Sequence, residues 1–207
     1  MHQHKGFSLI ELLVVLGMIL VILAVAIPIY KNAMDSVHLK EAGRRYAGIL
    51  QRGKLAAVAG NTYNAIGVQA LANSCTEVCV GIAYVDTTDT NNPPTNYAAP
   101  EPMAVLGSGV LWGSSGPATN DLNNKVFPSG TLSYPPVFGP RGLPCVPMAV
   151  TGGTICNTQG GNVAYATYFQ SPLGKWEAVT VNPAGEIQLW SYDPDASAWN
   201  QIENIKA

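Results

Sequence analysis

The order of apolar and polar residues divides the chain into a long helical rod and a strand-rich remainder. No charged side chain occurs from Leu12 to Ile29, and about 20 apolar residues suffice for a helix to cross a hydrocarbon layer roughly 30 Å thick. After Tyr30 the apolar residues keep the period of a helix as far as Gly60-Asn61, a pair typical of a helix end. The pattern therefore predicts one helix from Phe7 to Ala59, about 80 Å long.

The two halves of this predicted helix differ in character. Residues 7–30 are apolar all round and can span a membrane, whereas residues 31–60 are amphipathic. Along one face of the second half lie Met34, Val37, Tyr46, Ile49 and Leu50. We expect that face to pack on a globular domain. The basic cluster Arg44-Arg45-Arg52-Lys54 falls mainly elsewhere and is interpreted as a solvated face, with partner binding as the alternative.

Beyond Asn61 the pattern changes to short strand-like runs separated by loops. The runs span Ala65–Gln69, Val78–Val85, Ala104–Trp112, Ala164–Phe169, Lys175–Val181 and Glu186–Tyr192. The Pro- and Gly-rich stretches DTTDTNNPPTNYAAPEP and FPSGTLSYPPVFGPRGLP are typical of loops. The last two runs are joined by the turn Asn182-Pro183-Ala184-Gly185. Alternation along them predicts four inward positions: Val179, Val181, Ile187 and Leu189.

These runs follow one another without helical patterns between them, which favours antiparallel pairing. The predicted fold class is therefore α+β: a long N-terminal helix, transmembrane in its first half, packed on a C-terminal antiparallel sheet or sandwich. About 140 to 150 residues remain for that domain, residues 61–207, which is ample for one hydrophobic core.

One acidic residue, Glu11, interrupts the apolar run near its start. A carboxylate there costs free energy unless it is paired, and the nearest cation, Lys5, lies one to two helical turns back on the polar side. An ordinary secretory signal would explain the basic start, the apolar core and the small residues Ala24-Val25-Ala26. The run exceeds the usual core of roughly 7 to 15 residues, however. Neither that signal nor a generic one-pass anchor explains Glu11.

The stretch Lys5-Gly6-Phe7-Ser8-Leu9-Ile10-Glu11 resembles the type IV prepilin signal of type IV pilins and of the pseudopilins of type II secretion. The resemblance implies a leader, residues 1–6, that a membrane-embedded prepilin peptidase removes between Gly6 and Phe7, with methylation of the new N-terminal Phe7. It also implies that Glu11 pairs with the N-terminal amine of a neighbouring subunit and sets subunit register, since a paired buried acid is tolerated. Pro28 matches a proline common in that family, where it bends the helix.

Two further stretches narrow the resemblance. GRRYAGILQRGKLAAVAGN at the helix end and the terminal strand-turn-strand with Asn-Pro-x-Gly are similar to the corresponding parts of GspH/FimT-like minor pseudopilins and minor pilins. They imply a minor subunit of a type II secretion pseudopilus or type IV pilus, assembled through its N-terminal helix to initiate, cap or decorate the filament. The implied partners are other pilin or pseudopilin subunits, the prepilin peptidase and the inner-membrane assembly platform.

The resemblance also implies a location. The chain would pass once through the bacterial cytoplasmic (inner) membrane with its C-terminal domain extracytoplasmic, and would then enter a periplasmic or surface filament. The alternative within the class is a major pilin, or an adhesive tip pilin that binds a surface through loops around Asp86 to Pro102. The alternative outside the class is a secreted binding module or hydrolase released after Ala26.

Four cysteines, Cys75, Cys79, Cys145 and Cys156, fall in the part that this topology places outside the cytoplasm, where disulfides form. Three sets of pairs are possible, and proximity in sequence favours Cys75 with Cys79 and Cys145 with Cys156. The second bridge would need a loop wider than a tight turn at Gly152-Gly153. A four-cysteine zinc site is the alternative, but neither spacing is the usual C-x₂-C.

Other chemistry finds little support in the sequence. The formal net charge is −2 and 12% of residues are charged, so no basic field favours nucleic acid. After the leader, His38 is the only histidine, and no phosphate-binding glycine loop occurs. We therefore expect neither an enzyme nor a cofactor site. Asp193 and Asp195 are too few for a calcium loop and are typical of a turn, so we expect no metal site.

Overall fold

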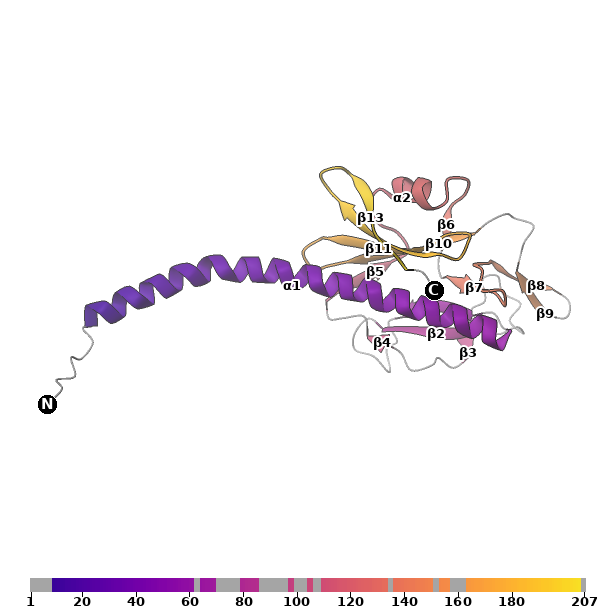
Figure 1. The fold of residues 1–207 in the computed structure, drawn as a ribbon, viewed down its shortest axis with the longest axis horizontal. Coiled ribbons are helices and arrows are strands. Elements are labelled where there is room, and N and C mark those ends of the chain that lie inside the picture. Colours follow the sequence, from indigo (N-terminus) through magenta and orange to yellow (C-terminus); the bar gives the residue numbers. More distant parts are fainter. Residues whose placement is uncertain are drawn as a thin grey trace.

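The computed structural model describes residues 9–61, 64–69, 79–85, 97–98, 104–105, 109–133, 136–150, 153–156 and 163–205. A long helix extends well beyond a domain of strands, and only its C-terminal half lies against that domain (Figure 1). The strands that follow the helix pair mainly antiparallel. This arrangement confirms the predicted α+β fold class.

Helix α1 runs without interruption from Leu9 to Gly60, over 52 residues. It ends where Asn61 takes the left-handed conformation, with a φ of 50°, and the Asn61 amide donates to the carbonyl of Val58 at 3.3 Å. Asparagine visits this conformation more readily than most residues, because its short polar side chain can hydrogen-bond locally. Over the described residues, the predicted helix and its predicted stop are confirmed.

The described strands form two sheets and a separate hairpin. The first sheet has the order β3 (Tyr97–Ala98), β2 (Cys79–Val85), β1 (Asn64–Gln69) and β7 (Val137–Phe138), and β4 (Ala104–Val105) also pairs with β2. The second sheet has the order β13 (Ala198–Ile205), β12 (Ile187–Asp193), β11 (Trp176–Val181), β10 (Ala164–Gln170) and β5 (Leu111–Gly113). Strand β6 (Leu132–Ser133) pairs in parallel with β10. The hairpin consists of β8 (Pro147–Val150) and β9 (Gly153–Cys156).

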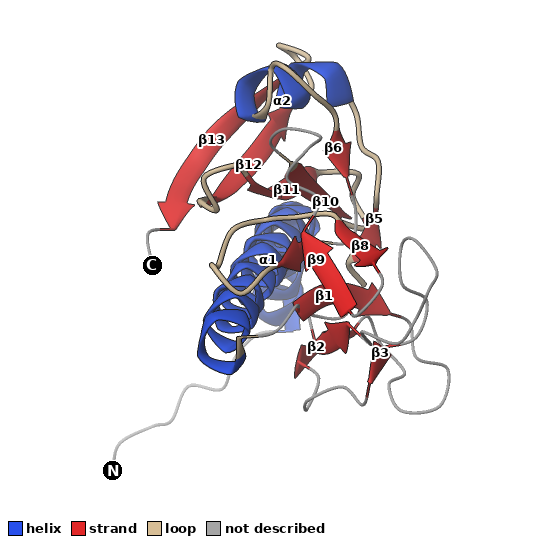
Figure 2. Cartoon of the chain, turned by 90° about the vertical axis from the view of Figure 1, so that its right-hand side faces the viewer, coloured by secondary structure: helices blue, strands red, loops and turns tan. Residues whose placement is uncertain are grey.

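The C-terminal half of α1 packs against both sheets. It contacts β1, β2 and β7 of the first sheet and β10, β11 and β12 of the second. Seen almost along its axis, the helix lies between the first sheet and the second (Figure 2). Because both sheets pack on it, this half of α1 is the centre of the domain.

Each predicted strand run contains a strand, and five of the six runs differ from the observed bounds by one residue at most at either end. The run Ala104–Trp112 was too long for one strand. It contains β4 and the start of β5, which pair with different sheets. The prediction that both Pro- and Gly-rich stretches are loops throughout is wrong. FPSGTLSYPPVFGPRGLP contains β6 and β7, and DTTDTNNPPTNYAAPEP contains β3.

The sequence pattern predicts neither β13 nor helix α2 (Thr119–Val126). In α2 only Leu122 and Val126 are buried, which is too little for a helical period to stand out. Strand β13 lies at a sheet edge, and among its residues 198–204 only Trp199 is buried, so it lacks a clean alternation. The expectation that no helix lies between the strands is thus corrected at α2.

The main core lies between α1 and the two sheets. Tyr46 is fully buried, its ring meets that of Phe169 edge-on with centroids 5.3 Å apart, and its hydroxyl hydrogen-bonds with that of Thr167 at 2.9 Å. The four positions predicted to face inward are all at most 2% exposed and belong to this core: Val179, Val181, Ile187 and Leu189. The alternation predicted from the sequence is confirmed.

The helix face that packs on the sheets is rotated from the predicted one. Tyr46, Ile49 and Leu50 are buried as expected, but Val37 is 53% exposed while Leu39 is buried. At about 100° per residue, Val37 points roughly 200° away from Leu39 around the helix. Small residues fill much of the true face: Ala42, Gly43, Ala47, Gly53 and Ala57. They let the sheets approach the helix closely.

A second core lies on the other side of the second sheet, beneath α2. Leu122 of α2 is fully buried, and the ring of Trp199 packs against that of Tyr168 with centroids 5.7 Å apart. The Trp199 amide donates to Asp121 Oδ2 at 2.8 Å, and Lys125 Nζ donates to the Trp199 carbonyl at 2.7 Å. Hydrogen bonds from Lys125 and from the Trp199 amide lower the pKa of Asp121. These bonds fix α2 over β13.

Among the cysteines, the structure describes the side chain of Cys145, which is buried and disulfide-bonded. The Tyr165 hydroxyl donates to its carbonyl at 2.5 Å. In the β8–β9 hairpin Cys156 is paired with Pro147, so Cys145 lies two residues past the position opposite Cys156. Cys75 and the side chains of Cys79 and Cys156 lie outside the described part. The two favoured pairs stay predictions.

Glu177 of β11 carries a carboxylate into the interface between α1 and the second sheet. The residue is 3% exposed, and its Oε2 has no hydrogen-bond partner among the described residues. A Cβ atom at Gly43 would come within 3.1 Å of this oxygen, so the glycine leaves the space that the carboxylate occupies. Burial raises the pKa of Glu177 to about 7, although the charges of Lys40 and Arg44 act to lower it.

We expect Glu177→Gln to stabilise the domain above pH 7 and to change little at acid pH. Because the folded state holds the proton more tightly, the stability contributed by Glu177 is complete below the ordinary pKa of 4.5 and is lost as the pH rises through about 7. The neutral amide should add on the order of 1–2 kcal/mol to the free energy of unfolding at alkaline pH.

Urea unfolding across this pH range measures the effect. Glu186→Gln, in the exposed turn after β11, is the matched control and should leave the pH dependence as it is. If Glu177→Gln also left the pH dependence of stability unchanged, the prediction that the buried Glu177 carboxylate destabilises the domain above pH 7 would be wrong.

Candidate assembly surface

The N-terminal half of α1 projects from the domain without cover. Every residue from Leu9 to Ala33 is exposed, and Leu9 reaches 81% and Leu20 68%. An 18-residue window of this half has a mean hydropathy of 3.2, and none of it is buried against the described part of the chain. By length and composition the segment can cross a membrane.

This apolar surface cannot face water in the working protein. Leaving a single Leu or Ile side chain exposed forgoes about 1.5–3 kcal/mol relative to full burial, and here such side chains surround the helix over six turns. A helix that is apolar all round is covered by lipid or by other helices. By its length and its uniform apolar character, the N-terminal half of α1 fits a membrane or a set of packed helices.

Glu11 lies in the first turn of α1 and is exposed. The positive end of the helix dipole favours an acid at this position, though only by a few tenths to about 1 kcal/mol. From Leu12 to Ile29 the sequence offers no basic side chain. Within the apolar half of α1, the Glu11 carboxylate therefore has no cation of its own, and a partner must come from outside this segment.

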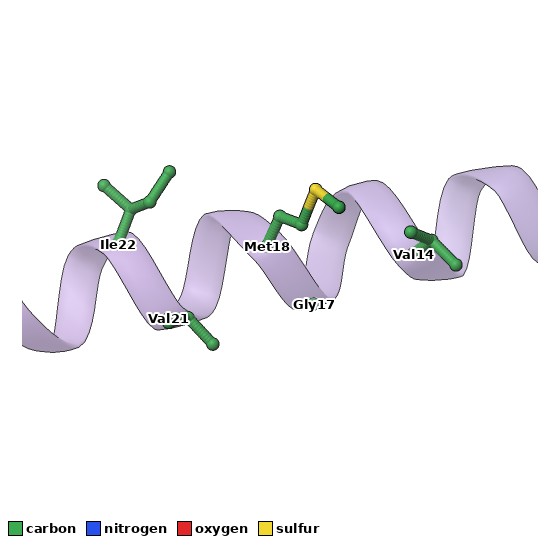
Figure 3. A pocket seen from close by; sticks show the side chains of 5 residues that line it. All are labelled: Val14, Gly17, Met18, Val21 and Ile22. Atoms are coloured by element: carbon green, nitrogen blue, oxygen red, sulfur yellow. The ribbon is translucent and has the colours of Figure 1, made fainter.

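A shallow apolar hollow lies on the same half of the helix (Figure 3). Its lining residues are Val14, Gly17, Met18, Val21 and Ile22. Apart from the backbone of the same helix turns and the adjacent residues, no described atom lies within 4 Å of the position that a Cβ at Gly17 would take. Glycines that open a hollow in this way let a second helix approach closely in apolar surroundings. The hollow fits helix–helix packing.

Pro28 lies inside α1, and the helix continues through it. Proline has no backbone N–H, so the carbonyl four residues earlier loses its usual donor. Figure 1 shows that α1 curves gently along its length. The predicted bend at Pro28 itself stays a prediction. Gly6 and Phe7, the predicted cleavage and methylation positions, lie outside the described residues.

The basic cluster on the second half of α1 is partly engaged with the domain. Arg44 Nε lies 3.4 Å from Glu203 Oε2 on β13, and Lys54 Nζ donates to the Gly185 carbonyl at 3.0 Å. Arg45 pairs with a glutamate one turn earlier on the helix. Because both arginine pairs are largely exposed, each stabilises the fold little.

The other candidate residues form no common site. Asp193 closes a turn, since its Oδ1 accepts from the amides of Asp195 at 3.0 Å and Ala196 at 3.3 Å; the predicted turn is confirmed. His38 is partly exposed on α1. In the part of the chain that the structure describes, no three His, Cys, Asp or Glu side chains gather where they could hold a metal ion.

Residues 1–27 match the protein family described as the prokaryotic N-terminal methylation motif. No curated protein and no solved structure matches the chain. The family match covers the predicted leader, Glu11 and most of the apolar run, and it ends before Asp35, the first buried residue of α1. Within α1, the match therefore concerns the exposed half alone.

A variant that begins at Lys31 should be soluble and folded without detergent. All buried residues of α1 lie at or after Asp35, so the truncation removes no core contact. Its thermal unfolding should match that of the domain in the full chain held in detergent. A control that begins at Arg44 also loses the buried Leu39 and should be less stable by roughly 2–5 kcal/mol. Insolubility of the first variant would contradict this division of α1.

Proposed function

We propose that this chain, which the N-terminal methylation motif identifies as a type IV prepilin-like protein, is a minor subunit of a type II secretion pseudopilus or a type IV pilus. It initiates, caps or decorates the filament. The observation that carries this proposal is the uncovered apolar half of α1, which coincides with the matched motif. Packed helices in a filament core would supply the missing cover.

In the proposed pathway, prepilin peptidase cuts between Gly6 and Phe7 and the amine of Phe7 is methylated. The subunit then stands in the inner membrane through residues 7–30, with its domain on the extracytoplasmic side. The assembly platform moves it from lipid into the filament. The apolar half of α1 suits both states, because lipid tails and neighbouring apolar helices both exclude water.

Glu11 would act during that transfer. Its carboxylate lies at the start of the apolar half, and the new amine of a neighbouring subunit offers the cation that this half of its own helix does not contain. An acid and an ammonium in apolar surroundings attract strongly, but only if they meet in good geometry. The pair would therefore select one axial register between neighbouring subunits. Because an unpaired acid is unfavourable in apolar surroundings, a register in which Glu11 is paired is more stable than one in which it is not.

The minor-subunit role has its own support in the domain. The two stretches that resemble GspH/FimT-like proteins meet at Lys54 of the helix end, which bonds the Gly185 carbonyl of the Asn-Pro-x-Gly turn. A side chain on Gly185 would approach the Gly142 carbonyl oxygen to 3.1 Å, and Gly185 has a φ of 78°. Glycine is therefore required at this turn. Two stretches far apart in sequence are thus in contact in the folded domain. This contact supports taking their similarity to GspH/FimT-like proteins as a single feature.

Three alternatives make different demands. A major pilin would be the bulk protein of sheared filaments, and an adhesive tip pilin would use loops between Asp86 and Pro102, most of which lie outside the described residues. A protein released after Ala26 would be cut inside α1, and its discarded piece would carry Glu11 and the whole of the Gly17 hollow. Release after Ala26 leaves the acid in the discarded piece without a role. The two pilin alternatives keep Glu11 and differ from the minor subunit in copy number and in the surface that binds.

Intact mass and N-terminal sequencing of the protein from membranes of its native host should give a chain that starts at methylated Phe7. Replacing Gly6 with leucine should leave the full precursor uncut, because the bulky side chain blocks the peptidase. As a matched control, Ala24→Leu alters the ordinary-signal pattern and should be processed normally. A chain that starts after Ala26, or Gly6→Leu still cut after position 6, would refute the prepilin pathway.

Glu11→Ala should be processed and inserted into the membrane but should enter sheared filaments several-fold less than the unaltered chain. Glu11→Asp keeps the charge on a shorter side chain and should recover part of the loss. Quantitative immunoblots of filament and membrane fractions measure both. The same blots give the copy number relative to the bulk filament protein, which is low for a minor subunit. Equal incorporation of Glu11→Ala would remove the assigned role.

A further inference from the structure

The β10–β11 hairpin is fastened to α1 at the end of the domain nearest the apolar half. Lys175 Nζ donates to the Asn32 carbonyl at 3.2 Å and to Ser36 Oγ at 2.5 Å. Two backbone hydrogen bonds close the turn, both at 2.9 Å: the Ser171 amide donates to the Lys175 carbonyl, and the Gly174 amide donates to the Ser171 carbonyl. The hairpin tip is therefore held at a fixed level along α1.

That level can be set against the thickness of a membrane. The charge-free run from Leu12 to Ile29 is 18 residues, or about 27 Å of helix, close to a hydrocarbon layer of roughly 30 Å. Asn32 lies three residues, about 4.5 Å, beyond Ile29. The headgroup layer on each side is about 5–7 Å thick. With α1 upright in a bilayer, the Lys175 ammonium is at the depth of the lipid headgroups.

The side chains at this end have the chemistry of a membrane interface. Leu173 at the hairpin tip is 52% exposed, and Leu111, which is paired with Gln170 on the neighbouring strand, is 61% exposed. Tyr30 and Lys31 are exposed on α1 at the same level. Tyrosine and lysine at the end of a span anchor it in the headgroup layer, and exposed leucines enter the interface.

We propose that the β10–β11 hairpin rests on the outer surface of the membrane while the subunit is anchored there. In this arrangement Leu173 enters the interface, and Lys175 and Lys31 lie among anionic lipid phosphates. Figure 1 shows the hairpin directly beside α1, at the side of the domain that faces the apolar half. The acidic turn that carries Asp193 joins the next pair of strands, β12 and β13, and stands further from α1 in Figure 1. The lipid contact is thus confined to the hairpin beside α1.

The contact would fix the orientation of the domain before assembly. A single span leaves a domain free to tilt, whereas a span and a second contact restrict it. Withdrawal into a filament would break the hairpin contact at the moment the apolar half leaves the lipid. The inference rests on the membrane-anchored state of the proposed function and adds a lipid-facing surface on the domain.

The experiment uses the full chain in vesicles of phosphatidylcholine with or without phosphatidylglycerol. An environment-sensitive fluorophore is attached at Leu173→Cys, at Leu20→Cys in the apolar half, or at Leu143→Cys. Leu143 is 42% exposed and follows Gly142, which contacts Val58 near the end of α1, so it lies far from the membrane. Labelling of the unsubstituted chain gives the background from its own cysteines. Lipids with a nitroxide on the headgroup then quench labels that lie in the headgroup layer.

We expect several-fold stronger headgroup quenching at Leu173→Cys than at Leu143→Cys. The difference should increase with phosphatidylglycerol and weaken with salt, since part of the attraction is electrostatic. Acyl-chain nitroxides should quench Leu20→Cys in the same vesicles.

Equal quenching at positions 173 and 143, with position 20 quenched by acyl-chain nitroxide, would overturn the hairpin contact and leave the membrane span and the proposed function standing. Loss of quenching at position 20 as well would overturn both. Shielding of position 173 that depends on protein concentration and not on lipid would assign this surface to a second copy of the chain, and would also overturn the proposal.

Discussion

The uncovered apolar half of α1 is the constraint on which the rest of the structure depends. Because this half carries apolar side chains on all sides, it needs surroundings that exclude water along its whole length. No part of the described chain folds back to provide them. The need for outside cover explains why a single acid, Glu11, can be kept there, since a partner that brings apolar cover can also bring a cation.

The second half of α1 must hold the domain firmly, because any force applied to the helix reaches the domain through it. Polar contacts occur along this half, among them those from Lys175 to Asn32, from Tyr46 to Thr167 and from Lys54 to Gly185. Asn32 and Lys54 are 22 residues apart, about 33 Å of helix. With the apolar core between them, these contacts fasten the domain over the full length of the docked half.

Elements with a strong local signal were predictable, and elements fixed by distant contacts were not. The helix up to Gly60 and the β11–β12 hairpin follow from periodicity and from turn residues that act within a few positions. Helix α2 has few apolar residues of its own and is fixed by Asp121 and Lys125, which bond the backbone of Trp199 some 78 and 74 residues away. No window of sequence contains such a contact.

By itself the sequence determined the class of the protein, because the prepilin signal, the apolar span and Glu11 form one continuous local pattern that residues 1–27 carry almost entirely. Only the tertiary structure decided which face of α1 docks, burying Leu39 and exposing Val37. It also decided that Glu177 is buried against Gly43 and that Lys175 meets the start of the docked half. These features depend on how the helix is rotated against two sheets, and that rotation results from packing that includes residues more than a hundred positions apart.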